Sequence, residues 1–195
     1  LSKASDLGGI KMAETPKTIY LKDYQPPVFL IPEVNLHFDL KEERTLVTNQ
    51  MKFVRNKKSN DDSKEVFLNG SKLKLVSIKR DGETLPESEY EKSKTGLLLK
   101  NCPDEFTLTT EVELHPETNK AFSGLYKTKT VYCTQMEAQG FRRTTFFQDR
   151  PDILSRYKVE VVADKEKYPI LLSNGNLVKE TDLESGRHSV VWEDP

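Results

Sequence analysis

The sequence predicts an all-β domain, a multi-stranded antiparallel sandwich or saddle with at most one short helix. Short runs in which apolar and polar residues alternate recur along the chain, and this period of two is typical of half-buried strands. Asn-Gly or Asp-Gly pairs begin at positions 69, 81 and 174 between such runs. These pairs favour the type I′ turns of hairpins. Because helical periodicity is almost absent, a sandwich of short strands is the expected architecture.

Alternation places the first two strands. Residues 34–40 place Val, Leu and Phe against polar neighbours, and residues 47–53 follow the same pattern. His37 falls on the polar side of the first strand, so we expect a surface histidine rather than a metal ligand. The wholly polar segment 56–64 is expected to form a loop.

The later strands are predicted by the same rule, at 73–78, 97–99, 106–114, 157–161 and 188–192. Residues 106–114 show the cleanest alternation in the chain. Only the stretch after Asp149, with Pro151 near its start, has a helical character, and we expect a turn or two there.

Composition limits the classes of function. At 195 residues the chain forms one large or two small domains. A net charge of −1, with Lys and Glu interspersed, argues against a nucleic-acid or polybasic membrane surface. No apolar run approaches the roughly 18 residues of a membrane span, and no secretory pattern is present.

The ends of the chain carry two further expectations. Residues 1–15 lack periodicity and contain Gly8-Gly9, which predicts a flexible lead-in before a domain at 16–195. Because the chain begins with Leu1 rather than Met, we expect a processed or cloned segment from which a leader could have been lost.

The two cysteines, Cys102 and Cys133, are too few for a disulfide framework. One bridge between them is an alternative, but two free, mostly buried thiols are favoured. Asn69 begins a glycosylation sequon, which matters only in a secreted protein, and the Asn-Gly turn explains the same residues without sugar.

The sequence offers no catalytic centre of its own. A zincin needs two histidines one helical turn apart with a Glu between them, whereas His37, His115 and His188 are scattered. No nucleophile elbow, phosphate-binding loop or dinucleotide fingerprint occurs. We therefore predict no catalytic residue and no metal ligand in this chain, with His115 and His188 structural.

A candidate binding pair lies at the end of a predicted strand. Gln135 and Glu137 are two residues apart after the β-like run 131–134, so their side chains share one face. A run with Phe146 and Phe147 and a turn at 149–152 follow. The carboxylate and amide can accept hydrogen bonds from a substrate cation, or they are ordinary solvated polar groups.

The segment 134–143 (TQMEAQGFRR), followed by 146–152 (FFQDRPD), resembles the N-terminal domain of the aminopeptidase N family of zinc metallopeptidases, especially its bacterial-type and protozoan branch. The resemblance is nearly continuous from about Pro16 to Pro195. Further matches occur in order at 115–119 (HPETN), 123–126 (SGLY), 163–165 (ADK), 167–169 (KYP), 171–176 (LLSNGN) and 186–188 (GRH). The Met136 position varies among relatives, and the mammalian ectoenzyme branch continues differently after the glutamate. The GFRR run fits the bacterial-type branch, which favours a single soluble chain.

The resemblance implies an N-terminal substrate-anchoring domain of a zinc aminopeptidase that removes N-terminal residues from peptides. By this resemblance Glu137 binds the substrate α-amino group and Gln135 lies beside the pocket for the first side chain. Ala138 completes the substrate-binding set, with a non-proline cis peptide bond between Glu137 and Ala138. The implied partners are peptide N-termini and the enzyme's own catalytic domain.

The family also implies that Zn²⁺ belongs to the parent enzyme and is held in a thermolysin-like domain that this chain does not include. The fragment alone is accordingly expected to be inactive, and the parent is expected in the cytoplasm. The alternative from another functional class is a stand-alone β-sandwich interaction module without peptidase activity.

Two arginines follow the candidate pair. Arg142 and Arg143 lie near Phe141 and Phe146, an arrangement that can stack on nucleic-acid bases, but one such pair in a neutral domain is a weak signal. We expect instead that they tie the loop to carboxylates such as Asp149 or Asp152.

Overall fold

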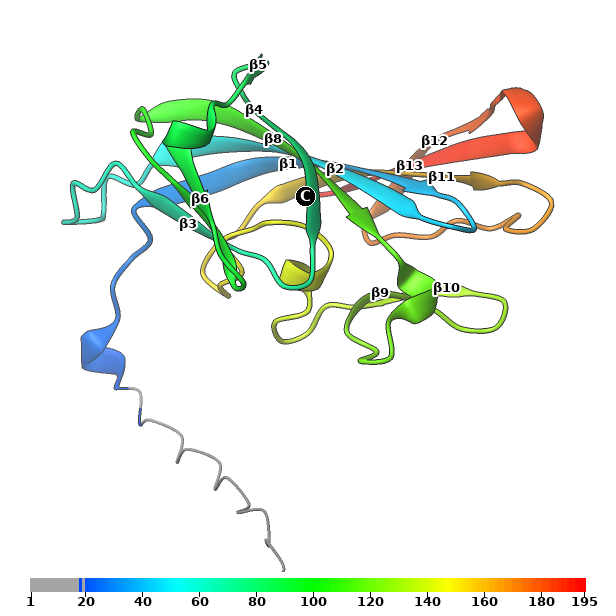
Figure 1. Ribbon diagram of the computed structural model, residues 1–195, viewed down its shortest axis with the longest axis horizontal. Coiled ribbons are helices and arrows are strands. Elements are labelled where there is room, and N and C mark those ends of the chain that lie inside the picture. Colours follow the sequence, from blue (N-terminus) through cyan, green and yellow to red (C-terminus); the bar gives the residue numbers. More distant parts are fainter. Residues whose placement is uncertain (1–17, 19) are drawn as a thin grey trace, which may run out of the picture.

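The computed structural model describes residue 18 and residues 20–195 (Figure 1). The predicted flexible lead-in at 1–15 lies outside the described residues. A long twisted sheet of eight strands has the order β12-β13-β11-β1-β2-β8-β4-β5. Its strands are β1 (Phe29–Leu40), β2 (Thr45–Arg55), β4 (Lys74–Arg80), β5 (Glu83–Thr84), β8 (Glu105–Leu114), β11 (Arg156–Asp164), β12 (Asn176–Asp182) and β13 (Arg187–Asp194).

Two smaller sheets complete the fold. One contains β3 (Val66–Asn69), β7 (Gly96–Leu99) and β6 (Tyr90–Lys92), and the other is the hairpin of β9 (Gly124–Lys127) and β10 (Tyr132–Gln135). Within the described residues, the helical segments are single 3-10 turns. They are η1 (Leu21–Asp23), η2 (Glu87–Glu89), η3 (Pro116–Thr118), η4 (Phe141–Arg143) and η5 (Glu184–Gly186). The all-β prediction is therefore confirmed.

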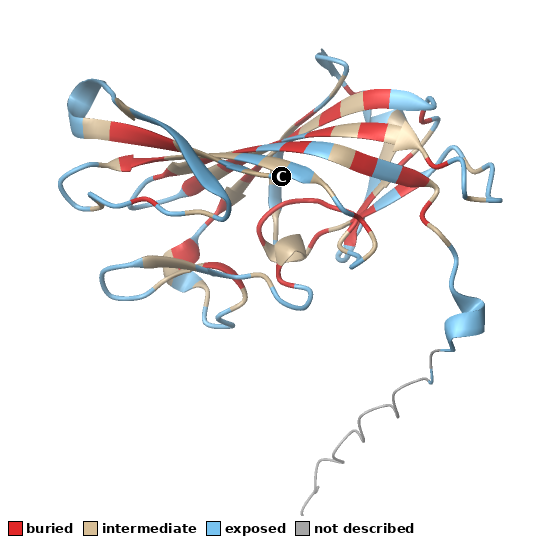
Figure 2. Ribbon diagram, turned by 180° about the vertical axis from the view of Figure 1, so that it is seen from behind, coloured by how far each residue is buried: buried red, intermediate tan, exposed pale blue. Residues whose placement is uncertain are grey.

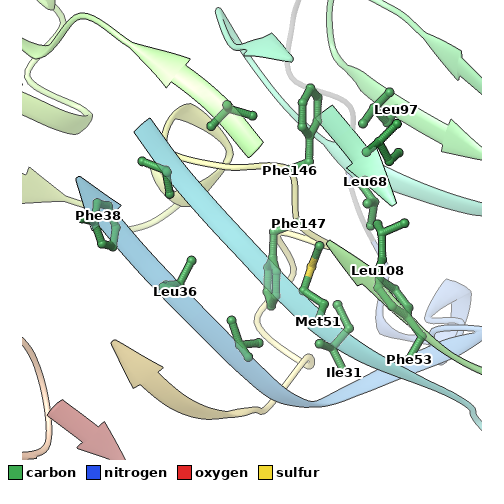
Figure 3. Close-up of a cluster of buried hydrophobic side chains, with 14 of the residues drawn as sticks. Ile31, Leu36, Phe38, Met51, Phe53, Leu68, Leu97, Leu108, Phe146 and Phe147 are labelled. Atoms are coloured by element: carbon green, nitrogen blue, oxygen red, sulfur yellow. The ribbon is translucent and has the colours of Figure 1, made fainter. Parts of the chain in front are cut away.

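One face of the large sheet forms most of the core. Buried and more exposed residues alternate strictly along β8, as expected of a strand with one face toward the core. The same alternation is visible along the neighbouring strands in Figure 2. Leu68 and Leu97 of the small sheet join Met51, Phe53 and Leu108 of the large sheet in the buried cluster of Figure 3. The two sheets thus form a sandwich.

Strand pairing differs from a simple antiparallel meander at two points. β1 and β11 are parallel, with Glu33 opposite Arg156 and Asp39 opposite Val162. In addition, β7 lies between β4 and β8 in the sequence but pairs with β3 and β6 in the small sheet instead of joining the large one. These pairings join segments that are distant in sequence, where local alternation carries no information on partners.

Of the three predicted hairpin turns, only the one at Asp81-Gly82 forms. Both residues have positive φ, 53° and 88°, between β4 and β5. The prediction at Asn69 is wrong, because β3 ends there and the chain passes to the other sheet, with the positive φ at Lys72. The prediction at Asn174 is also wrong. Gly175 has a φ of 83° but leads into β12 from a segment that is not a strand.

The predicted helix after Asp149 is wrong as well. Pro151 and Asp152 form only a turn, in which the Arg150 guanidinium holds the Asp152 carboxylate at 2.7 and 2.8 Å. The Ser155 hydroxyl then donates to the Ile31 carbonyl. This bond fixes the chain beside β1, so it continues directly into β11 instead of winding further.

An ion pair joins two strands of the large sheet. Arg187 of β13 donates to the Asp39 carboxylate and to the Leu40 carbonyl of β1, across the intervening β11. Burial raises the pKa of Asp39, but hydrogen bonds from Lys41 and Arg187 outweigh burial and leave it below its usual value. The carboxylate therefore stabilises the sheet as an anion.

Both cysteines are free thiols, as favoured above. Cys102 is buried and Cys133 is half-buried. Burial raises the pKa of Cys102 to about 11. None of the helical segments described is long and apolar enough to cross a membrane.

Candidate functional site: an exposed loop carrying Glu137

The predicted pair lies at the open end of the β9–β10 hairpin. β10 ends at Gln135, and residues 137–140 form a turn that leads into η4. Gln135, Glu137 and Ala138 are all exposed. The peptide bond between Glu137 and Ala138 is cis, as the resemblance implied.

Gly140 closes this turn. It is buried, and its backbone N–H donates to the Met136 carbonyl at 2.6 Å. A Cβ atom here would lie 2.2 Å from the Gln135 carbonyl oxygen and 2.8 Å from Met136 Cα. Such distances are far inside van der Waals contact. Glycine therefore lets the turn fold tightly back on the end of β10.

Arg142 anchors the loop, as predicted. Its Nε donates to Asp149 Oδ2 at 2.7 Å, its backbone N–H to the same oxygen at 3.2 Å, and Nη2 to the Asp149 carbonyl at 3.1 Å. Arg143 instead donates to the Ser123 carbonyl at 3.0 Å. Asp152 is not a partner of either arginine, because Arg150 and Tyr24 bind it. Both guanidinium groups of the pair are thus engaged inside the domain.

The segment after η4 fastens the loop to both layers of the sandwich. Phe146 and Phe147 are buried in the cluster of Figure 3. The backbone of Phe147 exchanges two hydrogen bonds with Asn69 of β3, at 2.7 and 3.1 Å. Asn49 of β2 donates its side-chain amide to the Phe146 carbonyl at 3.2 Å. In Figure 1 this segment (yellow) lies between the small sheet and the hairpin.

A broad groove adjoins the exposed loop, with a volume of about 950 Å³. Its floor is apolar and comes from the large sheet, including Phe38 of β1 and Val159 of β11. Glu137 and Ala138 line it from the hairpin side, and residues 167–174 line it from the other. Asp149 and Asp194 also line the groove, which therefore combines an apolar floor with carboxylates, of which Glu137 is the one on the exposed loop.

The acceptors of the loop are available to a ligand. Within the described part of the chain, the Glu137 carboxylate makes no hydrogen bond or ion pair, while Gln135 Nε2 donates to the Glu137 backbone carbonyl at 3.3 Å. This bond uses the nitrogen of the Gln135 amide and leaves its oxygen as an acceptor. An ammonium ion is the ligand best suited to such oxygens.

The histidines do not take part in this loop. His37 contacts Glu160 at 3.1 Å, while ring nitrogens of His115 and His188 contact the carbonyls of Glu43 and Tyr168 at 3.0 and 2.8 Å. These are structural contacts. Across residues 20–195, no three or more His, Cys, Asp or Glu side chains come together in a way that could hold a metal ion.

Several residues that shape the loop were not singled out from the sequence. Gly140 lies inside the segment 134–143. A glycine shortly after a predicted strand end was the available signal for a tight turn. Asn69 was assigned to a hairpin, yet it holds Phe147 by its backbone and accepts a hydrogen bond from the Asp149 N–H with its side chain. Only the spatial meeting of two distant segments reveals that role.

Known proteins share both the sequence and the fold. The chain is 47% identical over 182 residues to aminopeptidase N of Caulobacter vibrioides and 42% identical over 184 residues to that of Escherichia coli. These alignments cover 93% and 94% of this chain but 21% of each relative, so the chain spans about a fifth of their length.

Solved structures agree with the sequence relatives. The crystal structure of Legionella pneumophila aminopeptidase A in complex with aspartic acid has a TM-score of 0.84 and 36% identity, covering 89% of this chain and 20% of that one. An M1 zinc metallopeptidase from Deinococcus radiodurans shares the fold, with a TM-score of 0.68 at 10% identity over 87% of this chain and 39% of that one. Residues 23–195 match the profile of the Peptidase M1 N-terminal domain, and the chain belongs to that family.

Proposed function

We propose that residues 16–195 form the N-terminal substrate-anchoring domain of a zinc aminopeptidase that releases the first residue of peptides. Family membership and the names of the relatives support the class of enzyme. One observation carries the role of this domain. Glu137 presents an exposed carboxylate, unpaired among the described residues, on a loop fixed by buried contacts.

Glu137 is proposed to accept hydrogen bonds from the α-ammonium group of the substrate. A hydrogen bond between two ions is roughly twice as strong as one between neutral groups, and its strength grows where the substrate excludes water. The Gln135 amide oxygen supplies a second acceptor beside the first side chain. Ala138 adds little bulk at the margin of the groove.

The rigidity of the loop suits this role. Because Gly140, Arg142 and Phe147 already hold the turn, binding a substrate costs little ordering of the protein. An anion fixed at one end of the site recognises the free N-terminus of the substrate, so peptides with a blocked α-amino group lose this contact. The arrangement thereby favours removal of terminal residues over internal cleavage.

The metal requires residues other than these. The described side chains do not supply a set of ligands that fits Zn²⁺, so we place the zinc ion in a catalytic domain outside this chain. We propose that this catalytic domain packs against the groove. The relatives are about five times as long as the segment matched here, so they have room for such a domain.

Hydrolysis of a leucine-amide reporter and zinc content, measured side by side, test this proposal. Both are measured on the longest natural form of the protein and on residues 1–195. We expect activity and bound zinc in the long form and neither in the fragment. Absence of activity in both would contradict the proposal and favour the interaction-module alternative, which would then bind a protein through exposed Ile170 and Leu172 beside the groove.

A further inference from the structure

The hairpin that ends at Gln135 is a separate sheet. β9 and β10 pair with one another, from Lys127 opposite Tyr132 to Gly124 opposite Gln135, and in the described structure they join neither of the other two sheets. A two-stranded sheet is marginally stable by itself. Its position on the domain therefore depends on the flanking chain and on side-chain contacts, and the position of Glu137 follows from it.

One set of contacts lies at the end of the hairpin away from Gln135. Lys127 Nζ is 2.9 Å from Glu42 Oε2, in the connection between β1 and β2. The same ammonium lies 5.0 Å from the ring centre of Tyr132 and 5.7 Å from that of Tyr168. The Tyr132 hydroxyl donates to the Lys41 carbonyl at 3.2 Å.

The rings complete the arrangement. Tyr132 and Tyr168 pack edge to face with centres 5.1 Å apart, and the Tyr168 hydroxyl donates to Glu42 Oε1 at 3.3 Å. We name Glu42, Lys127, Tyr132 and Tyr168 the clasp. Two of its members belong to the hairpin and two to loops at the end of the large sheet, so the clasp links the separate sheet to the main one.

Lys127 is the centre of the clasp. Its side chain is only 13% exposed, whereas most surface lysines are freely solvated. Cation–π contacts gain strength when the cation is shielded from water, and contacts with Tyr168 and Glu42 raise the pKa of Lys127 above its usual value. Burial raises the pKa of Tyr132 to about 12. At neutral pH the clasp therefore holds a cation between a carboxylate and two aromatic rings.

We propose that Lys127 is a positioning residue for the Glu137 anchor. Held by Glu42 and the two tyrosine rings, it fixes the β9–β10 hairpin on the large sheet and so sets where Gln135 and Glu137 meet the substrate. This inference rests on the proposed function, and Lys127 itself does not touch the substrate. A misplacement of about 1 Å at a substrate-binding group can cost up to about 100-fold in rate.

The test uses the full-length enzyme, three single variants and one double variant. Lys127→Met keeps an unbranched side chain one atom shorter and removes its charge. Lys165→Met is the control, because Lys165 pairs with Asp182, is 52% exposed and lies outside both the hairpin and the groove. Glu137→Gln removes the charge of the anchor and is combined with Lys127→Met. The measurements are KM and kcat for a leucine-amide reporter, and hydrogen exchange of the β9 and β10 amides.

We expect Lys127→Met to raise KM by about tenfold with little change in kcat, and to speed exchange in the hairpin. Lys165→Met should leave KM and hairpin exchange unchanged. In the Glu137→Gln background, Lys127→Met should change KM by less than about twofold, because the group it positions is already disabled. An equal effect in both backgrounds would show a general structural role and overturn the proposal, as would an unchanged KM.

The outcomes also separate this inference from the function on which it rests. If Glu137→Gln alone leaves KM unchanged, the anchor itself is wrong and the positioning role falls with it. If Glu137→Gln raises KM but Lys127→Met does not, only the inference about the clasp fails. Should Lys127→Met fold poorly, Glu42→Gln weakens the same contact with a smaller change of volume, and its KM should shift in the same direction.

Discussion

Replacing Gly140 by alanine should distort the turn that presents Glu137. The backbone of Gly140 has φ −83° and ψ −20°, which alanine adopts freely, so any effect is steric. The added Cβ would lie 2.2 Å from the Gln135 carbonyl oxygen and 3.0 Å from that of Met136. Because both are backbone atoms, the turn must open and lengthen the 2.6 Å bond between the Gly140 N–H and Met136.

The expected cost follows from these two effects. Forced repacking costs about 1–3 kcal/mol, and the weakened hydrogen bond adds about 1 kcal/mol, so unfolding should become easier by about 2–4 kcal/mol. For a chain of this length, that lowers Tm by about 4–16 °C. The matched control is Gly82→Ala, where φ is +88° but nothing lies within 4 Å of a new Cβ. Its cost is backbone strain alone, about 1–2 kcal/mol.

Thermal unfolding of the chain measures the stability term, and KM of the full-length enzyme for the leucine-amide reporter measures the effect on the loop. Gly140→Ala should raise KM, because Gln135 and Glu137 flank the displaced backbone. Gly82→Ala, in the distant β4–β5 turn, should leave KM unchanged. If the two variants lose equal stability and keep the wild-type KM, the account of the turn is refuted.

Two further predictions follow from titratable groups. Because the folded pKa of Asp39 lies below its usual value, its stabilising pairs are present above the unfolded pKa of about 4 and are lost as the pH falls through the folded value. Asp39→Asn should therefore destabilise the chain in urea near pH 6 and progressively less toward pH 3, and a constant difference would contradict the assignment. Since the pKa of buried Cys102 is about 11, iodoacetamide at about pH 8 should label half-buried Cys133 first. Faster labelling of Cys102, read by mass spectrometry, would contradict its burial.

The alternating strands were predictable because each buries one face, whereas β12, which has no buried residue, was not predicted. In β8 every second residue is buried, and all of these except Thr110 are apolar, so local alternation identifies both the strand and its inward face. The same physics identified β1, β2, β11 and β13. Partners were not predictable in this way. The parallel contact of β1 with β11 depends on segments more than a hundred residues apart, and alternation is identical for parallel and antiparallel neighbours.

Asn-Gly and Asp-Gly pairs were a poorer guide, because the same residues serve either to form a hairpin turn or to make a contact with a distant segment. At Asp81-Gly82 the pair adopts the positive φ values of a hairpin. Asn69 instead uses its amide oxygen and its backbone to hold residues 147 and 149. Gly175 has no room for a side chain, since a Cβ would meet the Glu193 carbonyl at 2.1 Å. In both cases a long-range contact, invisible in the local sequence, determines the residue.

The family motif located the loop, while hydrogen bonds, charge and packing explain how the loop is anchored. Arg142 and Asp149 are seven residues apart, and Asp149 was one of the two carboxylates predicted to hold the arginines. The clasp was not, because Glu42, Lys127 and Tyr168 are separated by about forty residues or more at each step. Only the folded arrangement shows that an isolated hairpin needs them.

The most direct test of the central claim is kcat/KM of Glu137→Ala in the full-length enzyme, with Glu83→Ala on β5 as the control. Losing a charge-assisted hydrogen bond worth about 1.5–3 kcal/mol predicts a fall of roughly 10- to 150-fold. The fold should be unaffected, because the described structure gives the exposed Glu137 carboxylate no hydrogen bond to lose. Glu83→Ala should retain wild-type activity. A Glu137→Ala enzyme that keeps the wild-type kcat/KM would contradict the assignment of Glu137 as the anchor of the substrate amine.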